Sequence, residues 1–377
     1  MNFAFSDEQE EFRSVLRRFF EEKAPPAEVR RMLAAPAGFD PALWKQMAAE
    51  LGLQGVHLSE SLGGQGFGYL ELGIVLEEMG RALVPSPFFA SSVLAAEAIR
   101  CVATSEEQAV LLPGIASGQE IATLAFVEAG SGWDPAAVSL EARPEAGGYV
   151  LAGEKQVVLA ADAATLLLVA ARLPGTRGSE TGLVLAALEA NAPGVRSVPE
   201  ETIDLARRVG RIELDGARAK PLGAPGGAGV GLEKALARAR VALSAEMLGG
   251  ATRALEMGVA YAKQRVQFGR PIGSFQALKH MAADVLLELE LSRSAGYWAW
   301  WVADRDGPEL GEAAALAKAA CAEAYLLAAG TNLQLHGGIG FTFDADPQLH
   351  YRRARADAAL LGEPAEQRAA LARELGL

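Results

Sequence analysis

The chain has 377 residues, more than one ordinary hydrophobic core accommodates, so its length predicts two or three domains. Half of the residues are hydrophobic, which is enough to bury a large interior. The formal net charge of -12 argues against nucleic acid or an anionic membrane surface as the main partner.

The cysteines and the N-terminus indicate the compartment. Cys101 and Cys321 form neither a disulfide framework nor a metal-binding spacing, so we expect two reduced core thiols and no metal site. Four acidic residues between positions 7 and 11 exclude a secretory signal. The best apolar run, residues 157–171, is too short to span a membrane and contains Asp162. We therefore expect a cytoplasmic protein with no membrane-inserted segment.

The first 120 residues carry helical patterns. Ser6 and Gln9 have the spacing of a capping box, which predicts a helix from about residue 7. Asp40 and Pro41 have the favoured order of cap and first helical residue, and Gly52 predicts the end of that helix. Helical runs follow at residues 70–83 and 91–99, before a Pro-Gly pair at 113–114 interrupts the pattern. The glycine-rich stretch 63–66 follows no strand, so it predicts a turn rather than a phosphate-binding loop.

From residue 121 to residue 225 the pattern changes to short β-rich runs separated by Gly, Pro and Asp. These runs occupy residues 121–127, 137–140, 149–151, 165–170, 181–188 and 211–214. They predict a small β-barrel or β-sandwich, with residues 221–231 as the hinge that leaves it.

Residues 226–377 read as helix, with long interruptions only at 269–274, 304–311 and 336–346. The predicted fold is therefore α+β in three parts. These are an N-terminal helical domain (1–120), a central β domain (121–225) and a C-terminal helical bundle (226–377).

Between two long predicted helices, residues 261–284 form a polar elbow that contains Arg265, Gln267, Arg270 and Gln276. Arginine and glutamine at a helix-ending elbow suit the recognition of a phosphate or a nucleotide edge. A solvated helix-loop-helix corner is the alternative, and the residue types alone favour it.

The elbow resembles the signature of the acyl-CoA dehydrogenase flavoprotein family, which reads Arg-x-x-Phe-Gly-x-x-Ile-x-x-x-Gln. Here the signature residues are Arg265, Phe268, Gly269, Ile272 and Gln276. A second family stretch is QLHGGIGF at residues 334–341, and the N-terminal stretches FAFSDEQEEFRSVLRRFF and GLQGVHLSESLGGQGFGYLELGIVLEEMGR stand in family order. The resemblance covers essentially the whole chain.

This resemblance implies the same three-part fold and α,β-dehydrogenation of an acyl-CoA thioester. In the family a carboxylate base takes the α-proton, the β-hydride passes to the N5 atom of FAD, and an electron-transfer acceptor reoxidises the flavin. FAD normally lies across a subunit boundary, with its ring in one chain and its ADP half on a neighbour. The resemblance thus also implies an oligomer, typically a tetramer.

The residues that hold the ADP half are present. By resemblance, Arg265 meets the pyrophosphate, Phe268 packs beside the adenosine and Gln276 supports the same region. In the second family stretch, Gln334, Gly337 and Gly338 let amide and backbone groups approach the nucleotide, because glycine has no Cβ to collide with it. Leu335 and His336 between them are further candidates for cofactor binding. A plain helix-ending turn is the alternative for the two glycines, and the accompanying Arg-Phe-Gln set favours binding.

The residues that usually hold the flavin ring are largely replaced. In the loop that reads Thr-Glu-Pro-x-x-Gly-Ser-Asp in the family, Val127 replaces the Thr and Trp133 the Ser, so two hydroxyl donors are missing. In the later Lys-x-Trp-Ile-Thr-Asn run, Val157 replaces the Trp and Leu159 the Thr. Trp133 offers two alternatives: it stacks on the flavin in compensation, or it closes the pocket.

The catalytic base is absent from both family positions. Leu361 stands where the commonest base belongs, and Ala239 stands at the minority position before Arg240, which would support a base there. The remaining candidates are Glu363, two residues from the first position, and Glu246, about two turns beyond the second. A helix-surface or interface carboxylate is the simpler interpretation of both, so the base stays unassigned.

The usual contacts are missing from the part of the site that holds the flavin ring, whereas the residues that hold the ADP half are present. This pattern resembles that of the family members that assemble from two different chains. Our sharper hypothesis is therefore a flavin-site-completing subunit of a heteromeric acyl-CoA dehydrogenase. One alternative is a conventional homotetramer with a relocated carboxylate base. The other is a non-catalytic structural subunit without flavin, which would have no need of the ADP-contact set.

Overall fold

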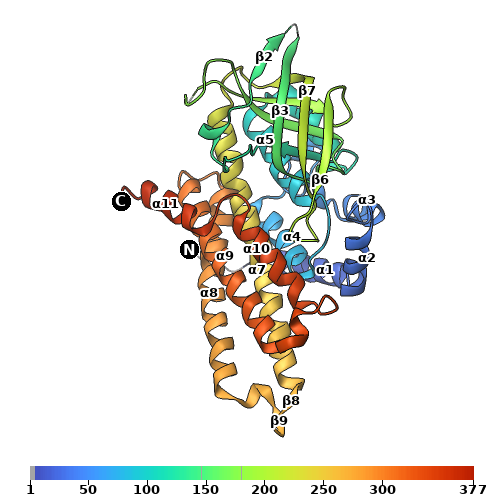
Figure 1. Cartoon of the computed structure of the whole chain (residues 1–377), viewed down its shortest axis with the longest axis vertical. Coiled ribbons are helices and arrows are strands. Elements are labelled where there is room, and N and C mark those ends of the chain that lie inside the picture. The colour runs from blue at the N-terminus through green and yellow to red at the C-terminus, as the bar shows by residue number, and fades with distance from the viewer. Residues whose placement is uncertain (1–4, 146, 180) are drawn as a thin grey trace.

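The computed structural model describes residues 5–145, 147–179 and 181–377. It has the three expected parts: N-terminal helices, a central β domain and a C-terminal helical bundle. Figure 1 shows the β domain at one end of the long axis, and the long helices of the bundle extend from it to a hairpin at the opposite end.

The N-terminal part begins with the predicted capping box. The Ser6 hydroxyl accepts from the Gln9 backbone N–H at 3.2 Å, and the Gln9 side chain accepts from the Ser6 N–H at 3.0 Å. Gly52 ends another helix in the left-handed region, at φ 61°. The helices are α1 (Asp7–Lys23), α2 (Pro26–Ala34), α3 (Pro41–Leu51), α4 (Tyr69–Ala82), a π-helical segment (Phe89–Ala95), α5 (Ala96–Val102) and α6 (Ser105–Ala116).

One helix of this part lies outside the predicted runs, and one expectation is wrong. Helix α2 was not predicted, although Pro26 at its first turn follows the usual preference for proline there. Pro113 does not interrupt the helical pattern, because α6 continues to Ala116. Proline so close to the end removes only one hydrogen bond of the last turn.

The β domain is a seven-stranded sheet in the order β1-β4-β5-β7-β3-β2, with β6 also paired to β7. Strand β1 is parallel to β4, and the other pairs are antiparallel. The strands are β1 (Ala122–Ala125), β2 (Ala142–Glu145), β3 (Gly148–Leu159), β4 (Leu166–Arg172), β5 (Leu183–Glu189), β6 (Val195–Glu200) and β7 (Val209–Leu222).

The β-rich run at 137–140 is not a strand. The Asp134 carboxylate accepts from the Ala136 N–H at 2.8 Å and starts a short 3₁₀ turn, Pro135–Ala137. Strand β6, which the sequence did not predict, pairs with β7, and all of its residues are exposed or half-buried, so it lacks a strong apolar alternation.

The C-terminal part is built around α7, which packs against α4, α8, α9 and α10. Glycines allow α4 and α7 to approach closely: a Cβ on Gly249 would lie 1.8 Å from the Glu77 carbonyl, and one on Gly80 would lie 2.1 Å from the Glu246 carbonyl. The elements are α7 (Ala228–Gln264), β8 (Val266–Gln267), β9 (Arg270–Pro271), α8 (Gln276–Asp304), α9 (Leu310–His336), α10 (Pro347–Ala359) and α11 (Pro364–Glu374).

Within the described ranges, one helical stretch, Leu310–Phe341, is long and apolar enough to cross a membrane by length and composition. In its most apolar window 67% is buried inside the protein, as for a helix at the centre of a bundle. Helix α9 makes up most of this stretch, and it packs against α7, α8, α10 and α11.

Candidate functional site

The elbow of the sequence is a tight β-hairpin, β8–β9, at the end of α7. Val266 pairs with Pro271 and Gln267 with Arg270, which leaves Phe268 and Gly269 as the two turn residues. Both have positive φ, 55° and 76°, as the two central residues of a type I′ turn require. A left-handed conformation costs a residue other than glycine about 1–2 kcal/mol. Yet Phe268 is 90% exposed, so its ring does not repay that cost by burial within this chain.

The polar residues of the hairpin are also open to solvent. Arg265 and Gln276 are exposed, and among the described residues no carboxylate lies within ion-pair distance of the Arg265 guanidinium. The Arg270 guanidinium instead lies 4.2 Å from the centroid of the Phe275 ring. No Asp or Glu occurs between residues 257 and 283. The hairpin therefore presents an uncompensated positive charge on an otherwise acidic protein.

The turn at the end of α9 lies beside the hairpin. The His336 ring stacks on Tyr261, with centroids 4.1 Å apart, and Tyr261 is one turn before the end of α7. The His336 Nδ1 atom lies 2.9 Å from the Asn332 carbonyl, one turn earlier on α9. The structure thus brings the two predicted sets for the ADP half, residues 265–276 and 334–338, to one end of the bundle.

Within this turn, Gln334, Gly337 and Gly338 are exposed, and a Cβ on either glycine would meet open space. Gly337 has φ 61°, which favours glycine. Leu335 is 5% exposed and its side chain packs against Gly258 of α7, so that side chain lies in the core of the bundle.

At the other end of α7, a cleft of about 710 Å³ separates the β domain from α11. Trp133 lines it and lies parallel to the Phe126 ring, with centroids 5.8 Å apart and an interplanar angle of 7°. Of the other ring-contact positions, Val127 and Leu159 are buried, and Val157 is 38% exposed in a bulge at φ 53°. Of these four side chains Trp133 is the one that lines the cleft, and none of the four carries a hydroxyl.

The cleft is lined by more carboxylates than cations. Its charged residues are Asp134, Glu233, Glu366 and Glu374 against Arg240 and Arg373. Burial lowers the pKa of Arg240, while three of the carboxylates oppose that shift. The Arg240 Nε atom donates to the Leu361 carbonyl at 3.0 Å. Arg240 therefore anchors a turn of its own chain and faces no candidate base.

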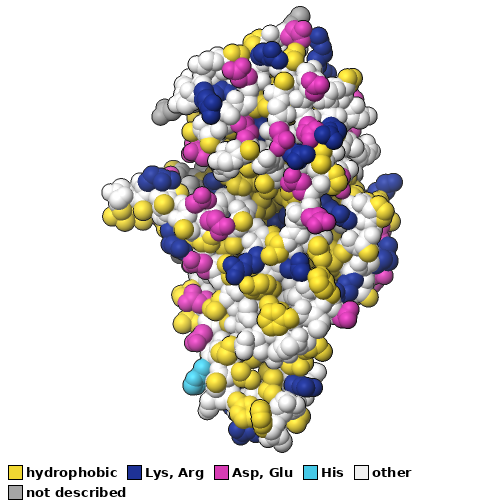
Figure 2. All heavy atoms as spheres, viewed as in Figure 1, with side chains coloured by type: hydrophobic (Ala, Val, Ile, Leu, Met, Phe, Trp, Pro, Cys, Tyr) yellow, Lys and Arg dark blue, Asp and Glu magenta, His cyan; other side chains and the backbone are white. Residues whose placement is uncertain are grey.

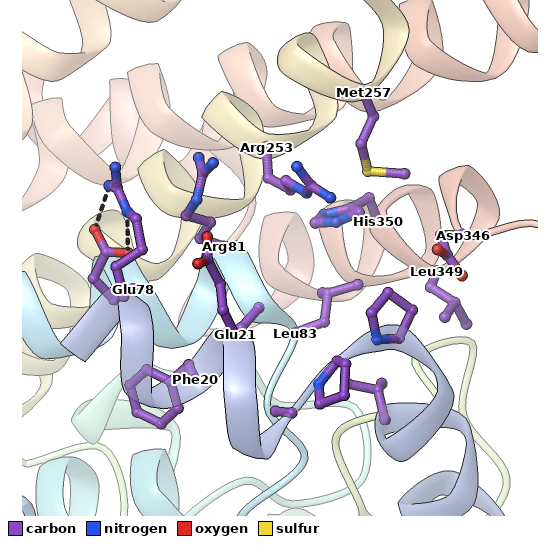
Figure 3. A pocket seen from close by; sticks show the side chains of 16 residues that line it. Phe20, Glu21, Glu78, Arg81, Leu83, Arg253, Met257, Asp346, Leu349 and His350 are labelled. Atoms are coloured by element: carbon purple, nitrogen blue, oxygen red, sulfur yellow. Dashed lines mark hydrogen bonds and ion pairs between the residues drawn. The ribbon is translucent and has the colours of Figure 1, made fainter. Parts of the chain in front are cut away.

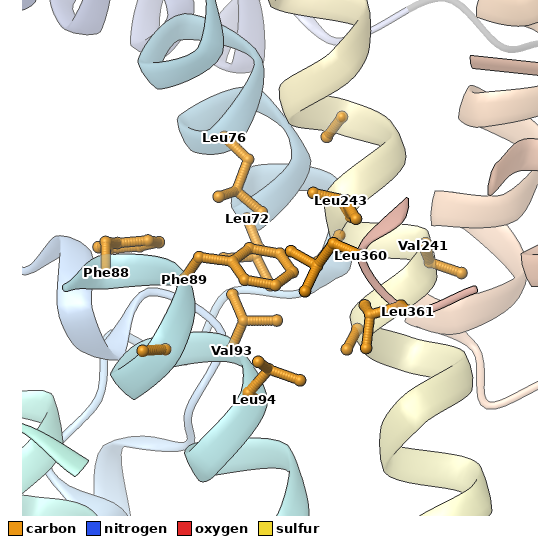
Figure 4. Packing of buried hydrophobic residues seen from close by; sticks show 14 of the residues in the cluster. Leu72, Leu76, Phe88, Phe89, Val93, Leu94, Val241, Leu243, Leu360 and Leu361 are labelled. Atoms are coloured by element: carbon orange, nitrogen blue, oxygen red, sulfur yellow. The ribbon is translucent and has the colours of Figure 1, made fainter. Parts of the chain in front are cut away.

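Leu361 is completely buried in a hydrophobic cluster (Figure 4). It stands at φ 61° in the turn between α10 and α11, and Leu360 beside it is 6% exposed. Figure 4 shows Leu360 beside the Phe89 ring of the π-helical segment and Leu361 nearer to α7. The position of the expected base is thus apolar, although Leu361 also borders the cleft.

The structure argues against both candidate bases. Glu246 is 5% exposed, and its Oε1 atom pairs with Arg207 at 2.6 Å and with Arg353. Both guanidinium groups hold this carboxylate inside the protein, and Glu246 does not line the cleft. Glu363 is exposed at the start of α11, and its backbone N–H donates to Glu366 at 2.9 Å. Glu363 does not line the cleft.

Sequence reasoning missed a buried ionic cluster around Glu246. Arg207 also pairs with Asp357 at 2.7 Å, and Arg353 pairs with Asp204. Burial raises the pKa of Asp357 to about 7. These residues come from the β6–β7 connection, α7 and α10, so no local spacing in the sequence reveals the cluster.

A separate cavity of about 160 Å³ lies between α1, α2, α4, α7 and α10 (Figure 3). Its arginines already have carboxylate partners: Arg17 pairs with Glu78 at 2.7 Å, and Arg81 pairs with Glu256. Its charges are therefore compensated within the chain, and we assign it no ligand.

Comparisons with known proteins cover the whole chain. Three family models match: the acyl-CoA dehydrogenase N-terminal domain at residues 6–119, the middle domain at 123–215 and the C-terminal domain at 227–376. The acyl-CoA dehydrogenase IpdE2 of Mycolicibacterium smegmatis is 32% identical over 364 residues, covering 96% of this chain and 97% of that protein.

Two solved structures share the fold at appreciable identity. The Tcur3481-Tcur3483 steroid ACAD has a TM-score of 0.88 and 34% identity, and covers 98% of both chains. The ChsE4-ChsE5 complex from Mycobacterium tuberculosis has a TM-score of 0.89 and 29% identity, covering 100% of this chain and 99% of that one. This chain therefore belongs to the acyl-CoA dehydrogenase family, oxidoreductases that act on acyl-CoA with FAD as cofactor.

Proposed function

We propose that this chain completes the flavin site of a heteromeric acyl-CoA dehydrogenase. Its hairpin and its α9 turn would hold the ADP half of a FAD whose ring lies in a homologous partner chain. In the complete site, FAD accepts the hydride of α,β-dehydrogenation.

The proposal rests on a contrast between the two half-sites: the hairpin end suits an ADP moiety, and the residues that usually hold the flavin ring are replaced. The end that suits an ADP moiety is open, basic and carries a strained, exposed Phe268. The cleft at the other end of α7 is lined by Trp133 and by more carboxylates than cations. The usual hydroxyl and aromatic contacts of the ring are replaced by Val127, Trp133, Val157 and Leu159. FAD thus fits the first half-site and not the second.

The two half-sites cannot serve one FAD molecule. Arg240 at the cleft and Arg265 at the hairpin are separated along α7 by roughly 38 Å of helix axis at the usual rise per residue. Figure 1 shows the hairpin and the β domain at opposite ends of the molecule. A FAD held at this hairpin therefore needs its ring site from another chain.

The comparisons support the same proposal at the level of relatives. Two of the similar structures carry two protein names each, Tcur3481-Tcur3483 and ChsE4-ChsE5. The first is described as a steroid ACAD, so the partner chain and a sterol-derived acyl-CoA substrate are the first candidates to test with this chain.

The test is the visible spectrum of the purified chain, with FAD counted per chain, before and after assembly with a homologous acyl-CoA dehydrogenase chain from the same source. We expect a colourless chain alone, no flavin reduction by acyl-CoA esters, and one FAD per pair of chains after assembly. A yellow chain that holds one FAD per copy, and whose flavin acyl-CoA reduces without a partner, would instead establish the homotetramer.

A further inference from the structure

The Phe268 ring stands in solvent at the tip of the β8–β9 hairpin. It is 90% exposed, and its backbone has φ 55° in the turn. The backbone fixes the direction in which the Cβ atom leaves the turn, but an exposed ring still rotates about its side-chain bonds. Ordering such a ring on binding a ligand costs side-chain entropy. A binding role for Phe268 is therefore favoured by a neighbour that orients its ring in advance.

Phe275 is the aromatic neighbour of Phe268. The centroids of the two rings lie 6.0 Å apart, and the ring planes are perpendicular, as in an edge-to-face pair. This is one of the arrangements that aromatic pairs prefer, so each ring favours a defined orientation of the other. In the part of the chain that the structure describes, Phe268 pairs with no other aromatic ring.

Phe275 also contacts the second strand of the hairpin. The guanidinium carbon of Arg270 lies 4.2 Å from the centroid of the Phe275 ring, at the distance of a cation–π contact. Arg270 pairs with Gln267 across the hairpin, directly beside the turn. Phe275 therefore supports both the turn residue Phe268 and the strand that follows the turn.

The backbone of Phe275 is fixed by the elements on either side of it. Phe275 follows the 3₁₀ turn Ile272–Ser274 and precedes α8. Its N–H donates to the Ile272 carbonyl at 3.1 Å, and its carbonyl accepts from the Lys279 N–H at 3.3 Å. The 3₁₀ turn packs against both α7 and α8. Phe275 thus belongs to the end of the bundle, whereas the hairpin projects beyond it (Figure 1).

Backbone hydrogen bonds hold the base of the hairpin but not its tip. The Arg265 N–H donates to the Tyr261 carbonyl, and the Ile272 N–H donates to the Arg265 carbonyl, each at 2.8 Å. Beyond this point each strand has two residues, and a hairpin so short is marginal without further packing. The Phe268–Phe275 pair lies where the backbone support ends.

We propose that Phe275 is a positioning residue for cofactor binding, which holds the Phe268 ring outward to pack beside the adenosine of FAD. Phe275 acts through Phe268 and does not itself contact the cofactor. The inference rests on the proposed function, which assigns the hairpin to the ADP half. It explains why an exposed ring stands at a strained turn position, because a surface that is already oriented binds at a smaller entropic cost.

The test is a double-mutant cycle on the assembled oligomer, in which the rate of FAD release is measured. Phe275→Leu keeps an apolar side chain but removes the ring, so it should speed release about threefold to tenfold. The oligomer mass should not change, because the ring lies at the tip of the hairpin. Phe268→Leu should speed release at least as much. In the Phe268→Leu background, Phe275→Leu should have no further effect.

The matched control is Phe67→Leu, which changes a phenylalanine before α4 that is 57% exposed, and it should release FAD at the wild-type rate. Wild-type release from Phe275→Leu would overturn the inference. Effects that multiply in the double variant would also overturn it, since Phe275 would then act independently of Phe268. If Phe268→Leu also releases FAD at the wild-type rate, the assignment of the hairpin to the ADP half fails as well.

A second measurement needs neither FAD nor assembly. Fluorine NMR of the chain alone, with para-fluorophenylalanine in place of Phe268, should show a resonance shifted by the ring current of Phe275. Phe275→Leu should move that resonance to the position of a free side chain. A resonance that is already at the free position with Phe275 present would contradict the positioning role, whatever the release rates are.

Discussion

Replacing a carboxylate with leucine at position 361 changes more than the proton acceptor. A carboxylate there would need water or a donor, whereas Leu361 is completely buried among apolar side chains. The Leu361 carbonyl accepts hydrogen bonds from the side chains of Arg240 and Gln367. The backbone of the turn is therefore specified by polar contacts, and the side chain contributes to the core.

The most direct prediction for a single residue concerns the contribution of Arg265 to FAD binding. Because its guanidinium has no carboxylate partner within the described chain, Arg265→Ala should weaken FAD retention by the assembled oligomer about tenfold to a hundredfold, as for the loss of one charge-assisted contact. The measurement is FAD content after dilution and gel filtration.

Arg270→Ala is the matched control, because it removes the same charge from the same hairpin. The Arg270 guanidinium rests on Phe275, so we expect a smaller loss of FAD from this variant. If both variants lost the same amount of FAD, the positive charge of the hairpin as a whole, rather than Arg265 itself, would account for FAD retention. Unchanged FAD content in Arg265→Ala would contradict the assignment of this residue to the pyrophosphate.

At the scale of elements, helix boundaries with a local chemical signal could be predicted. The capping box at Ser6 and the left-handed Gly52 are set by residues within one turn, so a single sequence contains the necessary information. The predicted interruption of the helical pattern at residues 304–311 matches the structure, since α8 ends at Asp304 and α9 begins at Leu310.

Elements and contacts decided by distant partners could not be predicted. Strand β6 exists because it pairs with β7, and its own residues show no clear alternation. Likewise, Arg207 and Arg353 meet at Glu246 although they are distant in the sequence. The sequence indicated that the base was missing, but no local signal placed Arg207 beside Phe89.

The α10–α11 turn allows a prediction that depends on pH. Burial lowers the pKa of Lys318 from 10.5 to about 8, while its amino group donates to two carbonyls. Lys318→Met leaves both carbonyls without this donor, and a buried unsatisfied group costs about 1–3 kcal/mol. The variant should therefore unfold at a lower temperature than the wild type at neutral pH.

The sign of the pH dependence follows from linkage. Between pH 8 and 10.5 the unfolded state binds more protons at Lys318 than the folded state, so this group makes folding more favourable as pH rises through that window. The gap in melting temperature between wild type and Lys318→Met should widen across it. Lys263→Met, which alters an exposed lysine of α7, should show no such widening. A constant gap would mean that the amino group is not desolvated in the folded state.

At the scale of the whole molecule, charge and exposed apolar surface are unevenly distributed. The protein carries a net charge of -12, but all charged residues between positions 257 and 283, at the hairpin end of the bundle, are basic. In the view of Figure 2 this end shows hydrophobic and basic side chains and no acidic ones. Such an arrangement suits contact with an anionic cofactor held by another chain.

The long helices of the bundle also leave apolar side chains in solvent. On α8, Leu286, Leu287 and Leu291 are 49%, 59% and 59% exposed, and on α9 Leu327 is 41% exposed. Ile339, Phe341 and Phe343 after α9 are more than half exposed. Helix faces of this kind are normally covered by another protein surface. We therefore expect an oligomer formed through the C-terminal bundle.

Sedimentation of the wild type should give a mass well above the 39.5 kDa of one chain. Leu287→Lys combined with Leu291→Lys should shift the protein toward smaller species and release FAD with them, because each lysine would have to be buried uncompensated in the interface. Val110→Lys changes a side chain on α6 that is 77% exposed, so it should leave the mass unchanged. A wild-type protein that stays monomeric at micromolar concentration, with its homologous partner present, would contradict both the interface and the shared flavin site. If instead the double variant keeps its mass but loses FAD, α8 would belong to the cofactor contact rather than to the assembly surface.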